Sequence, residues 1–263
     1  MSITTSKKKN PQQGTFSLLK KLTESLKVVT GSAAIFVGAQ FLAMILLGIF
    51  LSAAGGFDAA KIENLLTDSI LTQFVLVLMI EALVVAGVWV MVQFYDRKLK
   101  TVFNLQKPTL SLLWKVVKVF LLYLLVSWAA MLLISQTLPR VDTEMEQDIG
   151  FKNAAGWQLS IVFLALCVAV PIGEELMFRG LLFKGLNRYV GYLIAATITT
   201  LLFGAAHLEF IGGKPLNWAA GIDTAILSVF LIKLYKRTGT ITAPIMLHAL
   251  KNSLAFVFLF LVK

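Results

Sequence analysis

Long apolar runs alternate with short polar segments along most of the chain. Seven of these runs approach the roughly 20 residues that a helix needs to cross the hydrocarbon core of a bilayer. They cover 28–54, 70–95, 119–138, 153–173, 189–206, 216–232 and 241–262. The fourth run continues without a clear break into 174–187, which gives an eighth span if this segment breaks or re-enters. The pattern predicts an all-α, polytopic transmembrane bundle of seven to eight helices.

Composition points to the same class of protein. The 263 residues are 58% hydrophobic and only 14% charged, with a mean hydropathy of +0.82. A soluble domain has about 45–50% apolar and about 25% charged residues. This excludes a soluble enzyme, a disordered chain and a collagen-like chain, and it predicts an integral, multi-pass membrane protein.

The formal net charge is +10, and the positions of the charged residues along the chain are informative. Lysines crowd the N-terminal segment 1–27, and the polar segments that follow alternate between acidic (55–69 and 139–152) and basic (97–107 and 233–237). Because cytoplasmic loops of membrane proteins carry an excess of Lys and Arg, we expect a cytoplasmic N-terminus and a cytoplasmic basic leader over 1–27. The charge therefore indicates a lipid bilayer as partner and no nucleic acid.

The first chemical cluster lies at the end of the fourth apolar run. Glu174 and Glu175 are adjacent carboxylates, and Arg179 follows one helical turn later. Ionisable residues within membrane spans are costly and are functional candidates by default. The i,i+4 spacing allows Glu175 to pair with Arg179, which leaves Glu174 as an unpaired carboxylate able to act as a general base. The alternative is a charge cluster where the helix leaves the membrane.

The chain has two histidines, and both lie in apolar segments of the C-terminal half. His207 follows Phe203 by four residues, and His248 precedes Asn252 by four residues, so each pair shares a helix face. Isolated histidines are usually structural. Since neither is placed in a polar loop, the two histidines and the carboxylates together predict a polar site inside the bundle.

Three other charged residues lie within predicted spans. Glu81 is a candidate for the wall of the polar cavity, or equally a structural hydrogen-bonding residue. Asp223 either faces the cavity or, as we expect, marks the outer membrane interface. Lys251 can snorkel, or it can pair with Asp223 or Glu81.

The order E-E-x-x-x-R, F-x-x-x-H and H-x-x-x-N on successive membrane segments resembles the three motifs of the CPBP family. That family comprises intramembrane proteases, including type II CAAX-prenyl endopeptidases and the bacteriocin-processing or immunity proteins also called Abi. The resemblance covers roughly 156–262. The matching positions are Glu174, Glu175, Arg179, Phe203, His207, His248 and Asn252.

The resemblance implies a helical bundle around a hydrophilic catalytic cavity and a role for each motif residue. Glu174 would activate water with the help of His207, and His248 with Asn252 would form the oxyanion hole. Glu175, Arg179 and Phe203 would support them. We expect no cofactor. The alternative is a zinc ion held by His207, His248 and Glu174, because two histidines and a glutamate also form catalytic zinc sites.

The leading hypothesis is thus an intramembrane endopeptidase that hydrolyses a peptide bond near the cytosolic side of the membrane. Its substrate would be a peptide or protein, with a CAAX-type C-terminus (lipid-modified or not) or a peptide leader as candidates. The alternative is a non-catalytic membrane immunity or interaction protein. We expect N-terminal transmembrane helices over 28–155 and a CPBP-like catalytic core over 156–263.

Overall fold

In the computed structural model, which describes residues 11–56, 58–94, 103, 105–138, 141–142, 149–210 and 215–262, every regular element is a helix. The predicted all-α fold is confirmed. Six of the described helical segments are long and apolar enough to cross a membrane. The protein is an integral, multi-pass membrane protein.

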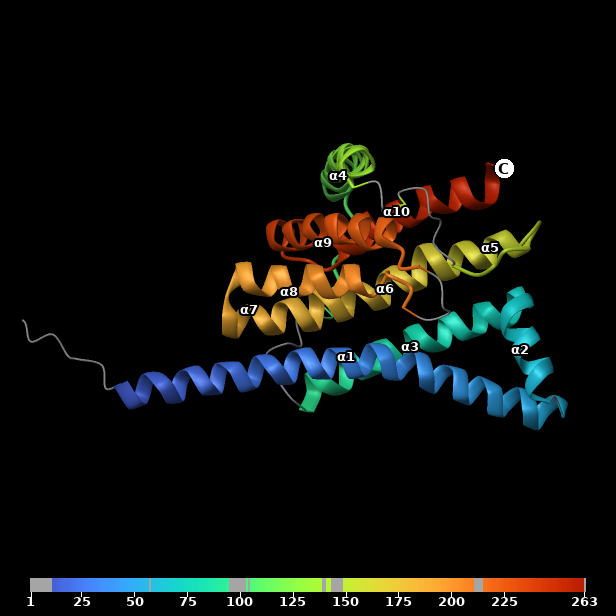
Figure 1. The fold of residues 1–263 in the computed structure, drawn as a ribbon, viewed down its shortest axis with the longest axis horizontal. Coiled ribbons are helices and arrows are strands. Elements are labelled where there is room, and N and C mark those ends of the chain that lie inside the picture. Colours follow the sequence, from blue (N-terminus) through green and yellow to red (C-terminus); the bar gives the residue numbers. More distant parts are fainter. Residues whose placement is uncertain are drawn as a thin grey trace, which may run out of the picture.

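The N-terminal half consists of a long helix and its antiparallel neighbour. Helix α1 (Pro11–Gly55) is joined through the short α2 (Ala59–Asp68) to α3 (Ile70–Phe94), and α1 and α3 pack along each other (Figure 1). Asp58 begins α2, since its carboxylate accepts a hydrogen bond from the Lys61 amide at 2.8 Å. Residues 11–27 of the predicted leader form the first turns of α1, while 1–10 lie outside the described residues.

A continuous helical rod runs through the middle of the molecule. It comprises α5 (Gln158–Phe163), the π-helix η2 (Leu164–Ala169), α6 (Val170–Glu175), the π-helix η3 (Leu176–Phe183) and α7 (Lys184–Val190) (Figure 1). Every residue of η3 is buried, because α1, α3 and α8 all contact it. π-Helical turns often occur at functional sites, and here they flank the two adjacent carboxylates.

The remaining helices cover the other side of this rod. Helix α8 (Tyr192–Ala205) packs on α9 (Trp218–Thr238), and α10 (Thr242–Phe256) continues into the π-helix η4 (Val257–Leu261). Helix α4 (Leu110–Thr137) contacts α9 and α10 and is viewed end-on in Figure 1. Gly204 and Gly221 let α8 and α9 approach closely, since a Cβ at Gly204 would lie 2.8 Å from the Gly221 carbonyl oxygen.

The predicted spans and the observed helices differ at one segment. The run 189–206 was predicted to cross the membrane, but α8 has only 14 residues. At about 1.5 Å per residue it reaches roughly 21 Å, less than the roughly 30 Å of a hydrocarbon core. Gly191, with a φ of +80°, ends α7 and starts α8 as a sharp turn. The helix is therefore short, and it ends inside the bundle next to the carboxylates.

Candidate active site

The carboxylates of α6 and the guanidinium of η3 form the predicted ion pair. Nη1 of Arg179 lies 2.7 Å from Oε1 of Glu175, and both side chains are fully buried. This confirms the pairing expected from the i,i+4 spacing. Oε2 of Glu174 is buried without a hydrogen-bond partner among the described residues, as is the second oxygen of Glu175. Since the guanidinium contacts Glu175, Glu174 is the carboxylate left available, as expected from the sequence.

A polar cavity of about 390 Å³ brings together residues from three separate elements. Glu174 comes from α6, His207 from the turn after α8, and His248 and Asn252 from α10. Glu175, Arg179 and Phe203 do not line the cavity but lie directly behind it. The residues selected from the sequence therefore form one cluster, although more than 70 positions separate the first from the last.

The contact of His207 with the preceding helix α8 defines its tautomer. Nδ1 lies 2.8 Å from the carbonyl oxygen of Phe203. A carbonyl oxygen only accepts hydrogen bonds, so Nδ1 carries the proton. In the neutral ring, Nε2 then has a free lone pair. His207 can accordingly accept a proton in the cavity.

His248 lies between the two carboxylates. Its Nδ1 is 3.0 Å from Oε1 of Glu175, and its Nε2 is 3.7 Å from Oε2 of Glu174. The ring is almost completely buried, so the contact with Glu175 fixes its orientation. With Nδ1 donating to Glu175, Nε2 donates to a reacting group only when the ring is an imidazolium, whose charge Glu174 would balance.

Asn252 links α10 to the rod. Its Nδ2 donates a hydrogen bond of 2.8 Å to the carbonyl oxygen of Leu166 in η2. An amide nitrogen has two N–H groups, so one donor remains for another acceptor. Asn252 lies one turn beyond His248 on the same helix, which lets both side chains face the cavity.

The ring of Phe203 connects the ion pair with both histidines. Cζ of Arg179 lies 4.1 Å from its centroid, in cation–π geometry. The rings of His207 and His248 meet it edge-on, with centroids 5.1 Å and 5.8 Å away. Nε and Nη2 of Arg179 have no hydrogen-bond partner among the described residues. The face of the Phe203 ring compensates the guanidinium charge on this side.

The cavity wall also includes a charged group that we expected at the membrane interface. Asp223 lines the cavity and accepts hydrogen bonds from Tyr123 (2.7 Å) and Ser127 of α4. Its Oδ2 lies 3.9 Å from Nζ of Lys251, which confirms one of the pairings expected for this lysine. Of the two alternatives for Asp223, the one in which it faces the cavity is borne out, and Tyr123 and Ser127 of α4 cover its carboxylate.

The zinc alternative would use His207, His248 and Glu174, which all line the same cavity. Among the described residues, no three His, Cys, Asp or Glu side chains are grouped closely enough to hold a metal ion in this structure. Nδ1 of both histidines is engaged by a protein acceptor, which leaves Nε2 of each ring for a proton or a metal ion. A metal-binding histidine commonly donates its other ring N–H in this way, so these contacts fit both alternatives.

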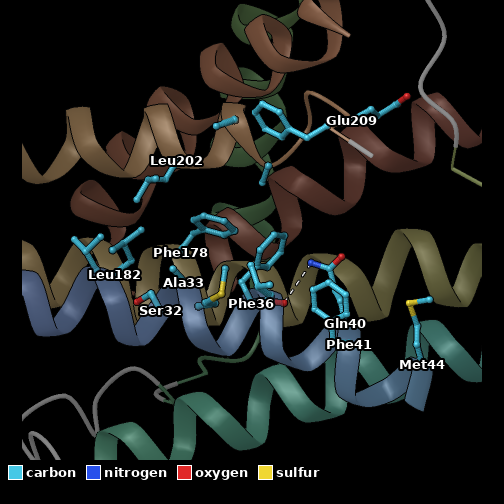
Figure 2. Close-up of a pocket in the computed structure, with 16 residues that line it drawn as sticks. Ser32, Ala33, Phe36, Gln40, Phe41, Met44, Phe178, Leu182, Leu202 and Glu209 are labelled. Carbon is cyan, nitrogen blue, oxygen red and sulfur yellow. Dashed lines mark hydrogen bonds between the residues drawn. The ribbon is translucent and has the colours of Figure 1, made fainter. Parts of the chain in front are cut away.

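A second, larger cavity of about 730 Å³ lies on the other side of the rings of Phe178 and Phe203. It is an apolar groove between α1, η3 and the end of α8, lined by residues such as Ala33, Phe36, Phe178 and Leu202 (Figure 2). The ring centroid of Phe178 lies 5.8 Å from that of Phe36 on the groove side and 4.7 Å from that of Phe203 on the side of the histidines. One aromatic side chain therefore links the groove to the histidine cluster.

Comparison with known families supports the resemblance seen in the sequence. Residues 156–254 match the model of the type II CAAX prenyl endopeptidase Rce1-like family, which confirms the resemblance to CPBP intramembrane proteases. Among curated proteins, the membrane-embedded CAAX protease MroQ of Staphylococcus aureus (strain USA300) is 27% identical over 107 residues. The match covers 38% of this chain and about 40% of the length of that relative. No solved structure matches significantly.

Proposed function

We propose that the protein is an intramembrane endopeptidase in which Glu174 activates a water molecule for attack on a peptide bond. The observation that carries the proposal is the convergence of Glu174, His207, His248 and Asn252 on one polar cavity within an apolar bundle. The family match over the same residues supports it.

In this mechanism the bond that forms joins the water oxygen to the scissile carbonyl carbon. Glu174 takes one proton from the water, and Nε2 of His207 is the second acceptor close to the reaction. Negative charge then develops on the carbonyl oxygen, and the free N–H of Asn252 donates to it. His248 adds a second donor at Nε2 when its ring holds a proton on both nitrogens. The C–N bond breaks as the leaving nitrogen receives a proton from Glu174.

Glu175, Arg179 and Phe203 would orient the side chains that line the cavity. Glu175 fixes the His248 ring, Arg179 holds Glu175, and Phe203 lies against Arg179 and both histidines. A preorganised site of this kind keeps its dipoles in place in a medium of low dielectric constant, where they act most strongly.

The apolar groove supports a substrate that carries a lipid or another long apolar group. The groove adjoins the catalytic cluster through Phe178, so an apolar chain lying in it would hold an attached peptide near Glu174. A CAAX-type C-terminus with a lipidated cysteine fits this description better than an unmodified peptide leader. The membrane itself would deliver such a substrate.

The reaction would take place near the cytosolic side, with the N-terminus in the cytoplasm. The distribution of Lys and Arg supports this orientation, because the segments 1–27, 97–107 and 233–237 are basic. Fusion of a reporter that is active on one side of the membrane to each terminus and to 139–152 tests it. An N-terminal reporter active outside the cell would contradict the orientation.

The proposal requires no metal ion, and it competes with a non-catalytic role as an immunity or interaction protein. Purified wild type and Glu174→Gln are incubated with prenylated CAAX-type and leader-type peptides, with and without a strong chelator. Cleavage that disappears in the variant and survives chelation supports the glutamate mechanism. Loss of cleavage under chelation favours zinc, and absence of cleavage by folded wild type favours the binding role.

A further inference from the structure

A third carboxylate lies behind Glu174 and comes from the N-terminal half of the chain. Glu81 is the only charged residue of the span Ile70–Gln93. Its Oε2 is buried and has no hydrogen-bond partner among the described residues. A buried, unpartnered carboxylate oxygen in a membrane span is costly unless it has a function.

Gly173 allows Glu81 to lie against α6. A Cβ at Gly173 would collide with Oε2 of Glu81 and would lie 3.0 Å from its Cδ. A glycine inside a helix costs about 1 kcal/mol relative to alanine. The helix has this glycine at the position directly before Glu174, where it makes room for the Glu81 carboxyl group.

The carboxyl group of Glu81 thus lies against the residue that directly precedes Glu174. Oε2 of Glu174 is also buried without a hydrogen-bond partner among the described residues. Two neighbouring carboxylates of this kind are both satisfied when a single proton is shared between them. Such a hydrogen bond would hold the Glu174 carboxylate in place.

The geometry points to Glu81 as a positioning residue for Glu174, which it holds through a shared hydrogen bond in the space left by Gly173. The inference rests on the catalytic role proposed for Glu174. It extends the active site to α3, which lies outside the segment matched by the family model. The N-terminal helices are then part of the catalytic machinery rather than only a membrane anchor.

Two substitutions of similar size separate positioning from packing. Glu81→Gln keeps a hydrogen-bond donor for Glu174, whereas Glu81→Leu keeps an apolar volume that suits a membrane helix. We expect Glu81→Leu to lower kcat about tenfold or more with KM unchanged, because a misplaced catalytic group loses rate rather than binding. Glu81→Gln retains most of the rate. Equal kcat for wild type and Glu81→Leu would overturn the inference.

The role of Gly173 is tested by a double-mutant cycle. We expect Gly173→Ala to lower kcat and the melting temperature when Glu81 is present. It should have no further effect in Glu81→Ala, since the new methyl group is then 3.5 Å from the Cβ of residue 81, an ordinary contact. Gly38→Ala is the matched control, because a Cβ there meets no atom within 4 Å. Independent effects of the two substitutions would contradict the close packing.

The shared proton is measurable without any substrate. Infrared difference spectra of the protein in detergent should show loss of a protonated carboxyl band in Glu81→Gln and a frequency shift of that band in Glu174→Gln, because Glu81 then keeps its proton but loses its acceptor. If Glu81→Gln removes no such band, or Glu174→Gln leaves it unshifted, the inference fails even for an active protease. If both changes occur while folded wild type cleaves no peptide, the Glu81–Glu174 pair stands and the proposed protease function fails.

Discussion

The imidazole of His248 is held by Glu175, whose Oε1 lies 3.0 Å from Nδ1 of the ring. The same carboxylate oxygen lies 2.7 Å from Nη1 of Arg179. A single buried oxygen thus neutralises a cation and orients a cavity residue. Any change at Glu175 therefore acts on stability and on the geometry of the site at once.

We expect Glu175→Gln to be strongly destabilising. Removing one partner of a buried ion pair costs about 3–5 kcal/mol, because the other charge stays buried without compensation. Thermal unfolding of the protein in detergent measures the effect. Glu24→Gln is the control, since Glu24 pairs with Lys27 at 3.0 Å on a more exposed surface, and such pairs contribute less than about 1 kcal/mol. Similar melting temperatures for the two variants would contradict this account of the pair.

Phe203→Leu tests the aromatic contact that supports the ion pair and the histidines. It removes the ring face 4.1 Å from Cζ of Arg179. A desolvated cation–π contact is worth about 2 kcal/mol. We expect lower stability together with a lower kcat, measured by unfolding and by peptide cleavage. Phe50→Leu on the exposed face of α1 should change neither, and an unchanged kcat in Phe203→Leu would show that the ring serves packing alone.

Much of the site could be predicted from the sequence because its residues are chemically unusual for a membrane span. Glu174, Glu175 and Arg179 are charged residues in an apolar segment, and the only two histidines both lie in apolar runs. Their helical spacing also gave the Glu175–Arg179 pair correctly. Such signals depend on local periodicity and on the cost of burying charge, which a sequence displays directly.

The remainder depends on contacts between helices that are distant in sequence. Asp223 was placed at the interface because nothing in 216–232 indicates that Tyr123 and Ser127 of α4 cover it. Tyr123 and Ser127 are spaced four residues apart on an apolar helix, and this polar pair was the available signal. The short length of α8 was missed because the apolar run 189–206 also contains the last residues of α7 and the turn at Gly191, so only Tyr192–Ala205 belongs to the helix.

Filling the apolar groove should affect lipidated substrates selectively. Ala33→Trp places a large ring in the groove beside Phe36 and Phe178. Because the groove would bury the lipid, we expect KM for a farnesylated peptide to rise about fivefold or more, as apolar contact area is lost. KM for the same peptide without the lipid should stay the same. Ile45→Trp on the exposed face of α1 is the control, and an equal rise for both peptides would contradict a lipid site.

The hydrogen bonds that Asp223 accepts should contribute to stability separately from its pairing with Lys251. Asp223→Asn keeps an oxygen that accepts from Tyr123 and Ser127, whereas Asp223→Leu removes the acceptor and leaves both hydroxyls buried. A buried hydroxyl without its partner costs about 1–3 kcal/mol. We therefore expect a clearly lower melting temperature for Asp223→Leu than for Asp223→Asn. Since both variants lose the charge that pairs with Lys251, equal melting temperatures would contradict this role of the two hydrogen bonds.

Substitution of Asn252 distinguishes most sharply between a structural and a catalytic hydrogen-bond donor. One N–H of its amide holds the carbonyl oxygen of Leu166 at 2.8 Å, and the other would donate to the oxyanion. Loss of one oxyanion donor lowers kcat about 10²–10³-fold, so we expect that loss in Asn252→Ala, with KM nearly unchanged. Asn252→Asp should be at least as impaired, because a carboxylate repels the developing charge.

The control for Asn252 is its neighbour on α10. The hydroxyl of Ser253 donates to the carbonyl oxygen of Ala249 at 2.7 Å, within its own helix, so Ser253→Ala should leave kcat almost unchanged. Steady-state kinetics and thermal unfolding are measured on the same preparations. If Asn252→Ala lowers the melting temperature but not kcat, its function is to tie α10 to the π-helical turn η2, and the oxyanion would have to rely on His248.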